Sequence, residues 1–208
     1  MKKLIAIVMM MLPMVAMLTG CKSDEDKVRE TAEAYLYKNM KNPESLKILS
    51  CEVRKDTIPF WLSEDMFDMA ETAQEALNRF SYYSDMSYLF VSEKYETAKA
   101  ASEAKEALQT AYKTAQQNDS IEVEYIAYVK SSGTNPMGGT VSNSSIIIID
   151  KNDPTKILGT YVVDNDFIKQ FVTIKMFGEG YDFKKNKFGK YETDRMPYLE
   201  QFVMNDAE

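Results

Sequence analysis

Carboxylates are the most abundant reactive groups in this chain of 208 residues, which has 32 Asp and Glu residues and no histidine. The absence of histidine excludes Ser-His-Asp and Cys-His catalysis and removes the commonest transition-metal ligand. Only two cysteines are present, so a cysteine-rich zinc site is excluded as well. The chemistry that remains is that of carboxylates, of a Lys or Tyr base, or of calcium binding.

The densest groups of carboxylates lack the spacing of an established site. DKNDP (150–154) and DNDF (164–167) supply oxygen ligands, but neither has the Gly and the further Glu of an EF-hand loop. Glu64, Asp65 and Asp68 could supply a carboxylate pair for glycoside hydrolysis, although the start of a helix explains acidic residues there equally well. We therefore expect no catalytic residue, no metal and no cofactor. A carboxylate-dependent glycan hydrolase remains an alternative.

A glycine-rich segment, GTNPMGG (133–139), invites comparison with a phosphate-binding loop. No Gly-Lys-Ser/Thr follows it and no helix is expected after it, so the comparison fails. Strands are expected on both sides, which makes residues 131–143 a long hairpin loop. Because loops held by a rigid sheet often carry binding residues, we take Asn135 and Met137 as candidate ligand contacts.

Tyrosine and phenylalanine are concentrated between residues 82 and 112. Their helical spacing favours packing between helices, while exposed rings there would bind sugars or a protein partner. The residues concerned are Tyr82, Tyr83, Tyr88, Phe90, Tyr95 and Tyr112.

The elements that must position these residues follow from the apolar pattern. Apolar residues at helical spacing predict a first helix over 25–41, and the run 45–55 predicts a strand with Leu49, Cys51 and Val53 on one face. No Gly or Pro occurs between Pro59 and Gly133, so a helical insertion is expected at about 62–117, folded into a hairpin near 81–87. The other expected segments are strands at 120–130, 145–150 and 157–163, a helix or strand at 164–177, and a helix at 196–204.

These segments predict an α+β fold. We expect an N-terminal helix packed on an antiparallel sheet of about four strands, with an inserted helical hairpin, in a single domain over 27–208. The net charge of −7 disfavours binding to nucleic acid, which depends on clustered Lys and Arg. It equally disfavours docking of the protein surface on anionic lipids.

The N-terminal segment has the three parts of a secretory signal peptide. Met1 to Lys3 form a basic start, and the apolar run from Leu4 to Leu18 is too short for a comfortable membrane span. Leu18-Thr19-Gly20-Cys21 then resembles the lipobox of bacterial lipoproteins. The resemblance implies cleavage between Gly20 and Cys21 and a lipid on Cys21, which would tie the protein to a membrane. Residues 1–20 would then be removed and residues 21–26 would form a lipidated tether. An ordinary secreted protein cut nearby is the alternative.

Further resemblances concern the bacterial group. Residues 22–26, KSDED, are similar to the acidic export signal of surface-exposed Bacteroidetes lipoproteins, which implies an outer-membrane protein at the cell surface. Asp56-Thr57-Ile58 and Asp119-Ser120-Ile121 resemble the O-glycosylation sites of the same bacteria, so Thr57 and Ser120 are candidate glycosylation sites.

About half of the chain resembles uncharacterised Bacteroidetes secreted proteins. The resemblance rests on the first helix, the segment KNPESLKILSCEV and the strands around GTNPMGG, and it implies a curled antiparallel sheet without a known activity. Together the sequence predicts a non-catalytic binding or interaction module. The partner would be a glycan or an envelope protein, and an accessory subunit of an envelope assembly is a further alternative.

Overall fold

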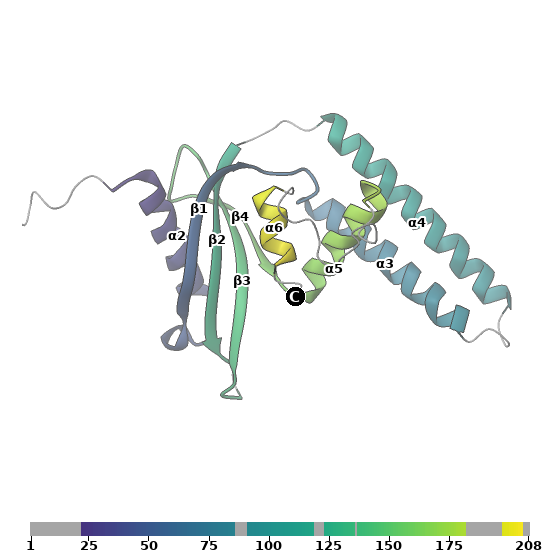
Figure 1. Ribbon diagram of the computed structural model, residues 1–208, viewed down its shortest axis with the longest axis horizontal. Helices are drawn as coiled ribbons and strands as arrows, with labels where there is room; N and C mark the ends of the chain where they lie inside the picture. The colour runs from purple at the N-terminus through teal and green to yellow at the C-terminus, as the bar shows by residue number, and fades with distance from the viewer. Residues whose placement is uncertain (1–21, 86–90, 119–122, 136, 182–196, 206–208) are drawn as a thin grey trace, which may run out of the picture.

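The structure is a computed structural model that describes residues 22–85, 91–118, 123–135, 137–181 and 197–205. Its centre is an antiparallel sheet of four strands in the order β1-β2-β3-β4. One helix covers one face of the sheet, while several helices cover the other face and a helical hairpin projects from that side (Figure 1). The predicted α+β fold, with an N-terminal helix on the sheet, is therefore confirmed. The strands are β1 (Lys47–Thr57), β2 (Val123–Thr134), β3 (Thr140–Ile149) and β4 (Ile157–Val163).

The first helix, α2 (Asp24–Asn39), begins earlier than the sequence suggested. The Ser23 hydroxyl accepts a hydrogen bond from the Asp26 backbone N–H at 3.1 Å, and the Asp26 carboxylate accepts one from the Ser23 N–H at 3.3 Å. This reciprocal capping box satisfies two N–H groups that a helix start would otherwise leave unpaired. The first turn of the helix, Asp24 to Asp26, thus overlaps the last three residues of the expected tether, and the helix starts one residue before the predicted range of 25–41.

Helix α2 packs on the sheet through Val28 and Ala32, both fully buried. They meet the side chains of β2 and β3 that point to this face, among them Val129 and Ile147. The Thr31 hydroxyl also donates to the carbonyl of Pro154 at 2.8 Å, in the turn between β3 and β4. This hydrogen bond fixes the position of α2 along the sheet, in addition to the packing that holds α2 on the sheet.

Strand β1 contains a bulge that alters the predicted face pattern. Ile48 pairs with Ser131 and Ser50 with Lys130, so Leu49 has no partner across the ladder. One extra residue reverses the side-chain alternation on either side of it. Ile48 therefore joins Cys51 and Val53 against α2, whereas Leu49 is 60% exposed. Our assignment of Leu49, Cys51 and Val53 to one face was wrong for this reason.

The hairpin between β2 and β3 is longer, and its loop shorter, than we expected. The strands stay paired as far as Thr134 opposite Thr140, which leaves only residues 135–139 to make the turn. The Asn135 side chain organises this turn by accepting hydrogen bonds from the Met137 and Gly139 N–H groups at 3.0 and 2.8 Å. The expected loop over 131–143 is mostly strand, because Ser and Thr pair well across a ladder.

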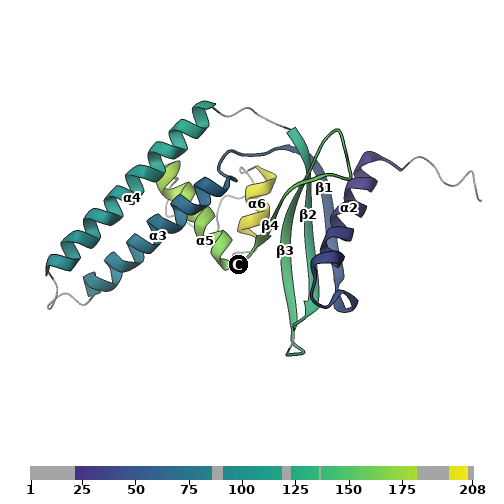
Figure 2. The ribbon, with the colours of Figure 1, turned by 180° about the vertical axis from the view of Figure 1, so that it is seen from behind.

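The insertion between β1 and β2 is a helical hairpin, as predicted. Helices α3 (Glu64–Asp85) and α4 (Val91–Asn118) run side by side and project from the sheet (Figures 1 and 2). The base of the hairpin packs into the main core, where Met66, Ala73 and Leu108 are buried. Since β1 and β2 are neighbours in the sheet, the hairpin takes the place of a simple turn.

The C-terminal part completes the second face of the sheet. Helix α5 (Asn165–Thr173) begins at the Asp164 cap, whose carboxylate accepts from the N–H groups of Asp166 and Phe167. It continues into a π-helical turn, η2 (Ile174–Gly178), so the segment that could have been helix or strand is helical. Helix α6 (Tyr198–Met204) lies on the sheet, and Lys175 of η2 forms a buried ion pair with Glu200 of α6 at 3.1 Å.

Candidate functional site

A groove lies on the face of the sheet away from α2, beyond the part that α6 covers. Its volume is about 520 Å³, within the range of small-molecule sites. We call it the sheet groove. Its lining residues are Leu49, Lys130, Ser131, Ser142, Asn143, Ser144, Val163, Asp164, Asn165 and Ile168.

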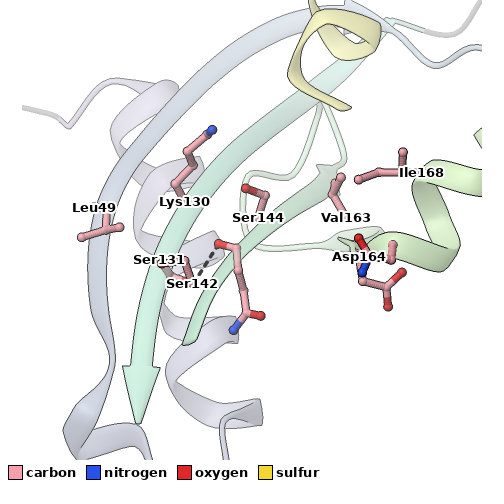
Figure 3. A pocket seen from close by; sticks show the side chains of 10 residues that line it. Leu49, Lys130, Ser131, Ser142, Ser144, Val163, Asp164 and Ile168 are labelled. Atoms are coloured by element: carbon pink, nitrogen blue, oxygen red, sulfur yellow. Dashed lines mark hydrogen bonds between the residues drawn. The ribbon is translucent and has the colours of Figure 1, made fainter. Parts of the chain in front are cut away.

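The lining of the sheet groove comes from separate segments of the chain. Figure 3 shows Lys130 and Ser144 on neighbouring strands, with Asp164 and Ile168 facing them from the start of α5. Hydroxyl, amide, ammonium and carboxylate groups therefore meet in one place, bordered by aliphatic side chains. Such a lining can both donate and accept hydrogen bonds, which suits a polar, uncharged or weakly charged ligand.

The Asp164 carboxylate already accepts hydrogen bonds at the start of α5. One of its oxygens, Oδ1, accepts from the N–H groups of Asp166 and Phe167 at 3.1 and 2.8 Å. Among the residues that the structure describes, it is the sole carboxylate that lines the sheet groove. Glycoside hydrolysis uses two carboxyl groups placed on either side of the scissile bond, and the lining of this groove has one.

A second cavity, of about 180 Å³, lies beside the sheet groove and shares Lys130 with it. We call it the aromatic cavity because rings from β2 and α6 form its walls. Tyr128 packs edge-on against Tyr198, with ring centroids 4.8 Å apart, and lies 5.2 Å from the Phe202 ring. Its lining residues are Ser50, Cys51, Glu52, Tyr128, Lys130, Tyr198, Phe202 and Asn205.

Charge at the rim of the aromatic cavity is organised around Glu52. The Tyr198 hydroxyl donates to Glu52 at 2.5 Å, and Arg54 donates to its other oxygen at 2.6 Å while stacking 3.7 Å above the Tyr198 ring. The hydrogen bond from Tyr198, supported by Arg54, lowers the pKa of Glu52 below its usual value. Burial, together with Glu52, raises the pKa of Tyr198 to about 12. The pair is therefore a carboxylate and a neutral phenol at physiological pH.

The predicted binding loop lies outside both cavities. The side-chain oxygen of Asn135 accepts two hydrogen bonds within the turn itself, and Met137 is 96% exposed at the tip. Thr57 is half-buried at the end of β1, and its N–H donates to Asp56. Gly20, Cys21 and Ser120 lie outside the described residues.

The other predicted candidates are spread over the hairpin. Glu64, Asp65 and Asp68 are exposed on the first turns of α3, and none of them lines the sheet groove or the aromatic cavity. Tyr112 is buried in the core, as its helical spacing suggested, whereas Tyr82 and Tyr95 are 59% and 69% exposed. Tyr88 and Phe90 fall outside the part of the chain that the structure describes.

The hairpin also carries a groove of about 440 Å³ between α3 and α4. Glu75 and Glu96 border it together with Arg79, which approaches Glu75 to 3.6 Å in an exposed ion pair. Exposed pairs of this kind contribute little to stability. Its lining includes three small residues, Ala76, Ala100 and Ala104.

Within the described ranges, no three His, Cys, Asp or Glu residues are grouped so that they could hold a metal ion. No described helix is long and apolar enough to cross a membrane. Comparison of the chain with protein-family models, with characterised proteins and with solved structures gives no match. The proposed function therefore depends on the chemistry of the two cavities.

Proposed function

We propose that the protein is an outer-membrane lipoprotein, anchored through Cys21 and displayed at the cell surface, that acts as a non-catalytic binding module. The sheet groove is its ligand site. The observation that carries this proposal is the lining of the groove, in which hydrogen-bonding side chains of β2, β3 and the start of α5 converge on one space of about 520 Å³.

The chemistry of the lining favours a hydroxyl-rich ligand such as a glycan. Ser142 and Ser144 offer hydroxyl groups and Asn165 offers an amide, so the groove presents both donors and acceptors. Leu49 and Ile168 supply apolar surface for the C–H faces of a sugar ring. A sheet holds these groups rigidly, which lowers the entropic cost of binding.

The position of α2 agrees with an anchor at Cys21. Helix α2 begins at Asp24 and covers the face of the sheet opposite the groove. A lipid on Cys21 would therefore hold the α2 side near the membrane and leave the groove accessible. In Figure 1 the hairpin also points away from α2.

Binding to an oligosaccharide array, followed by calorimetry on the best ligand, tests the ligand site. The variant Ser144→Ala/Asn165→Ala removes two polar groups from the groove, and Ser81→Ala removes an exposed hydroxyl from α3 as the matched control. Two lost hydrogen bonds at about 1 kcal/mol each predict an affinity roughly tenfold to thirtyfold weaker. Equal affinity of the two variants, or no glycan bound at all, would contradict the proposal.

Membrane fractionation tests the anchor. Cys21→Ala should move the protein from the membrane fraction to the soluble fraction, because the lipid would be its only attachment. Retention of Cys21→Ala in the membrane would refute acylation at this residue.

An accessory role in an envelope assembly is the second candidate, and the exposed rings of Tyr82 and Tyr95 on the projecting hairpin favour it. Replacing residues 80–97 by a short glycine-rich turn would remove the end of the hairpin beyond the buried Ala76 and Ala101. If the hairpin is the contact, envelope proteins that co-purify with the full chain are lost while ligand binding to the groove remains. If only the groove matters, neither property changes.

A further inference from the structure

We propose that the groove between α3 and α4 binds the same groove of a second copy of the chain, so that two hairpins pack face to face as a four-helix bundle. This inference goes beyond the proposed function, because it concerns the hairpin and not the sheet groove. We call the surface the hairpin groove. Its lining residues are Thr72, Glu75, Ala76 and Arg79 of α3 and Glu96, Thr97, Ala100 and Ala104 of α4.

The hairpin groove faces away from the helices that the hairpin contacts. Phe67 packs against a ring of α5, with ring centroids 4.9 Å apart, and Lys105 lies over a ring of η2. At about 100° per residue, Thr72 is turned by about 140° from Phe67, and Ala104 by about 100° from Lys105. Because α3 and α4 are antiparallel, both rotations place the groove on the side opposite to α5 and η2. The outer half of the hairpin also stands clear of the other labelled elements in both views (Figures 1 and 2).

The lining of the hairpin groove can be covered by another helix at little cost. Three of its residues are alanines, whose methyl side chains let two helix backbones approach closely. The hydroxyls of Thr72 and Thr97 already donate to carbonyl groups of their own helices, at 2.9 and 2.7 Å. Burial of these hydroxyls therefore leaves no donor unpaired.

The charges of the hairpin groove are complementary to those of a second copy. Since α3 and α4 run in opposite directions, Arg79 and Glu96 border the groove at the same level, one on each helix. A two-fold axis along the hairpin places α3 of one copy opposite α4 of the other without a change of level. Each Arg79 then faces Glu96 of the other copy, and the pair forms twice. The two hairpins point in the same direction, which is compatible with anchoring of both copies in one membrane.

Both members of this pair are available for it. Glu96 is exposed, and it forms no ion pair with any residue that the structure describes. Arg79 approaches Glu75 to 3.6 Å in its own chain. A guanidinium group has five N–H donors, so Arg79 can keep this contact and donate to Glu96 of the second copy as well.

Two tyrosines extend the surface toward the end of the hairpin. Tyr82 and Tyr83 follow Arg79 by three and four positions, so they continue the same helix face. Tyr82 is 59% exposed and packs edge-on against Tyr83, with ring centroids 5.4 Å apart. From Thr72 to Tyr83 the face is about 17 Å long, and two helices side by side are about 20 Å wide. An interface of this size lies at the lower end of specific interfaces, so we expect a weak, concentration-dependent dimer.

Sedimentation velocity under reducing conditions tests the proposal on the full chain with Cys21→Ala, so that neither a lipid nor a disulfide contributes to association. We expect a monomer–dimer equilibrium between about 1 and about 100 µM. Arg79→Glu and Glu96→Arg should each weaken dimerisation at least about tenfold, because each places like charges opposite one another twice. The double variant Arg79→Glu/Glu96→Arg restores opposite charges and should dimerise within about threefold of the unchanged hairpin.

Lys113→Glu is the matched control. It makes the same charge reversal at an exposed position of α4, nine residues beyond Ala104 and therefore about half a turn away from the groove face. Lys113→Glu should leave dimerisation unchanged. Circular dichroism confirms that every variant keeps its helices.

Three outcomes overturn the proposal. The first is a chain that stays monomeric over the whole concentration range, even if the hairpin binds an envelope protein. The second is dimerisation that Arg79→Glu does not weaken, because the contact then lies elsewhere. The third is a double variant that dimerises no better than the single variants, because Arg79 and Glu96 then do not face each other. Ligand binding at the sheet groove is a separate question, since the two grooves share no lining residue among those described.

Discussion

The buried ion pair between Lys175 and Glu200 is the contact whose removal should destabilise the fold most clearly. Lys175 is 5% exposed and Glu200 is 6% exposed, and the two side chains meet at 3.1 Å across the contact between η2 and α6. Glu179 also contacts the Lys175 ammonium group, but its side chain is 39% exposed and can be hydrated. Lys175→Met therefore leaves Glu200 as a buried charge without a cation.

The expected cost follows from that stranded charge. Removing one partner of a buried ion pair costs about 3–5 kcal/mol, which for a domain of this size lowers Tm by roughly 6–20 °C. In the double variant Lys175→Met/Glu200→Gln the side chain at position 200 is neutral, so most of the lost free energy of unfolding should be recovered. The coupling free energy between the two positions should then exceed about 2 kcal/mol.

Urea denaturation of the four proteins in this double-mutant cycle is the assay. A Lys175→Met variant within about 1 kcal/mol of wild type at pH 8 would refute the burial argument. Additive effects of Lys175→Met and Glu200→Gln on the free energy of unfolding would refute it as well.

Three further predictions concern individual contacts. Gly178→Ala should cost about 1–3 kcal/mol in denaturation, because its Cβ would lie 2.7 Å from Cδ2 of the buried Tyr112, whereas Gly159→Ala meets nothing closer than 3.5 Å and should cost less. Tyr198→Phe should raise the pKa of Glu52 toward its ordinary value, which an NMR titration measures. The lowered pKa in the wild type stabilises the fold above about pH 4.5, and this contribution is lost as the pH falls further. The stabilities of wild type and variant should therefore converge in acid. Ser23→Ala should cost about 0.5–2 kcal/mol through loss of the α2 cap, and equal stability of the variant would show that the helix does not depend on it.

Much of the fold could be predicted from local signals in the sequence. The helical hairpin follows from the long interval without Gly or Pro, and β4 from a short apolar run between turn residues. The segment FVTIKMF (171–177) was ambiguous because a short apolar run can be a buried strand or part of a buried helix, and periodicity alone does not separate the two. The Asp164 cap and packing of Phe171 on Trp61, with ring centroids 5.0 Å apart, favour the helix.

The sheet groove could not be predicted because its residues form no motif. Lys130, Ser144 and Asn165 belong to β2, β3 and α5, and only strand register and the β3–β4 turn bring them together. One signal was nevertheless present. Along the same face, Ile148 and Ile146 are followed at period two by Ser144, where the face changes from apolar to polar. That change marks where the helical cover ends.

The length of α6 explains why the groove is open. Helix α6 has seven residues and spans about 10 Å at 1.5 Å per residue, whereas β2 has twelve residues and spans about 40 Å at 3.3 Å per residue. Among the described helices, α6 therefore covers β2 near Tyr128, where the Tyr198 and Phe202 rings pack, and is too short to cover the whole strand. The bulge at Leu49 turns an apolar side chain toward the uncovered region. Bulges are frequent next to functional sites, so a bulge that turns an apolar side chain toward polar strand ends that no described helix covers agrees with the proposed ligand site.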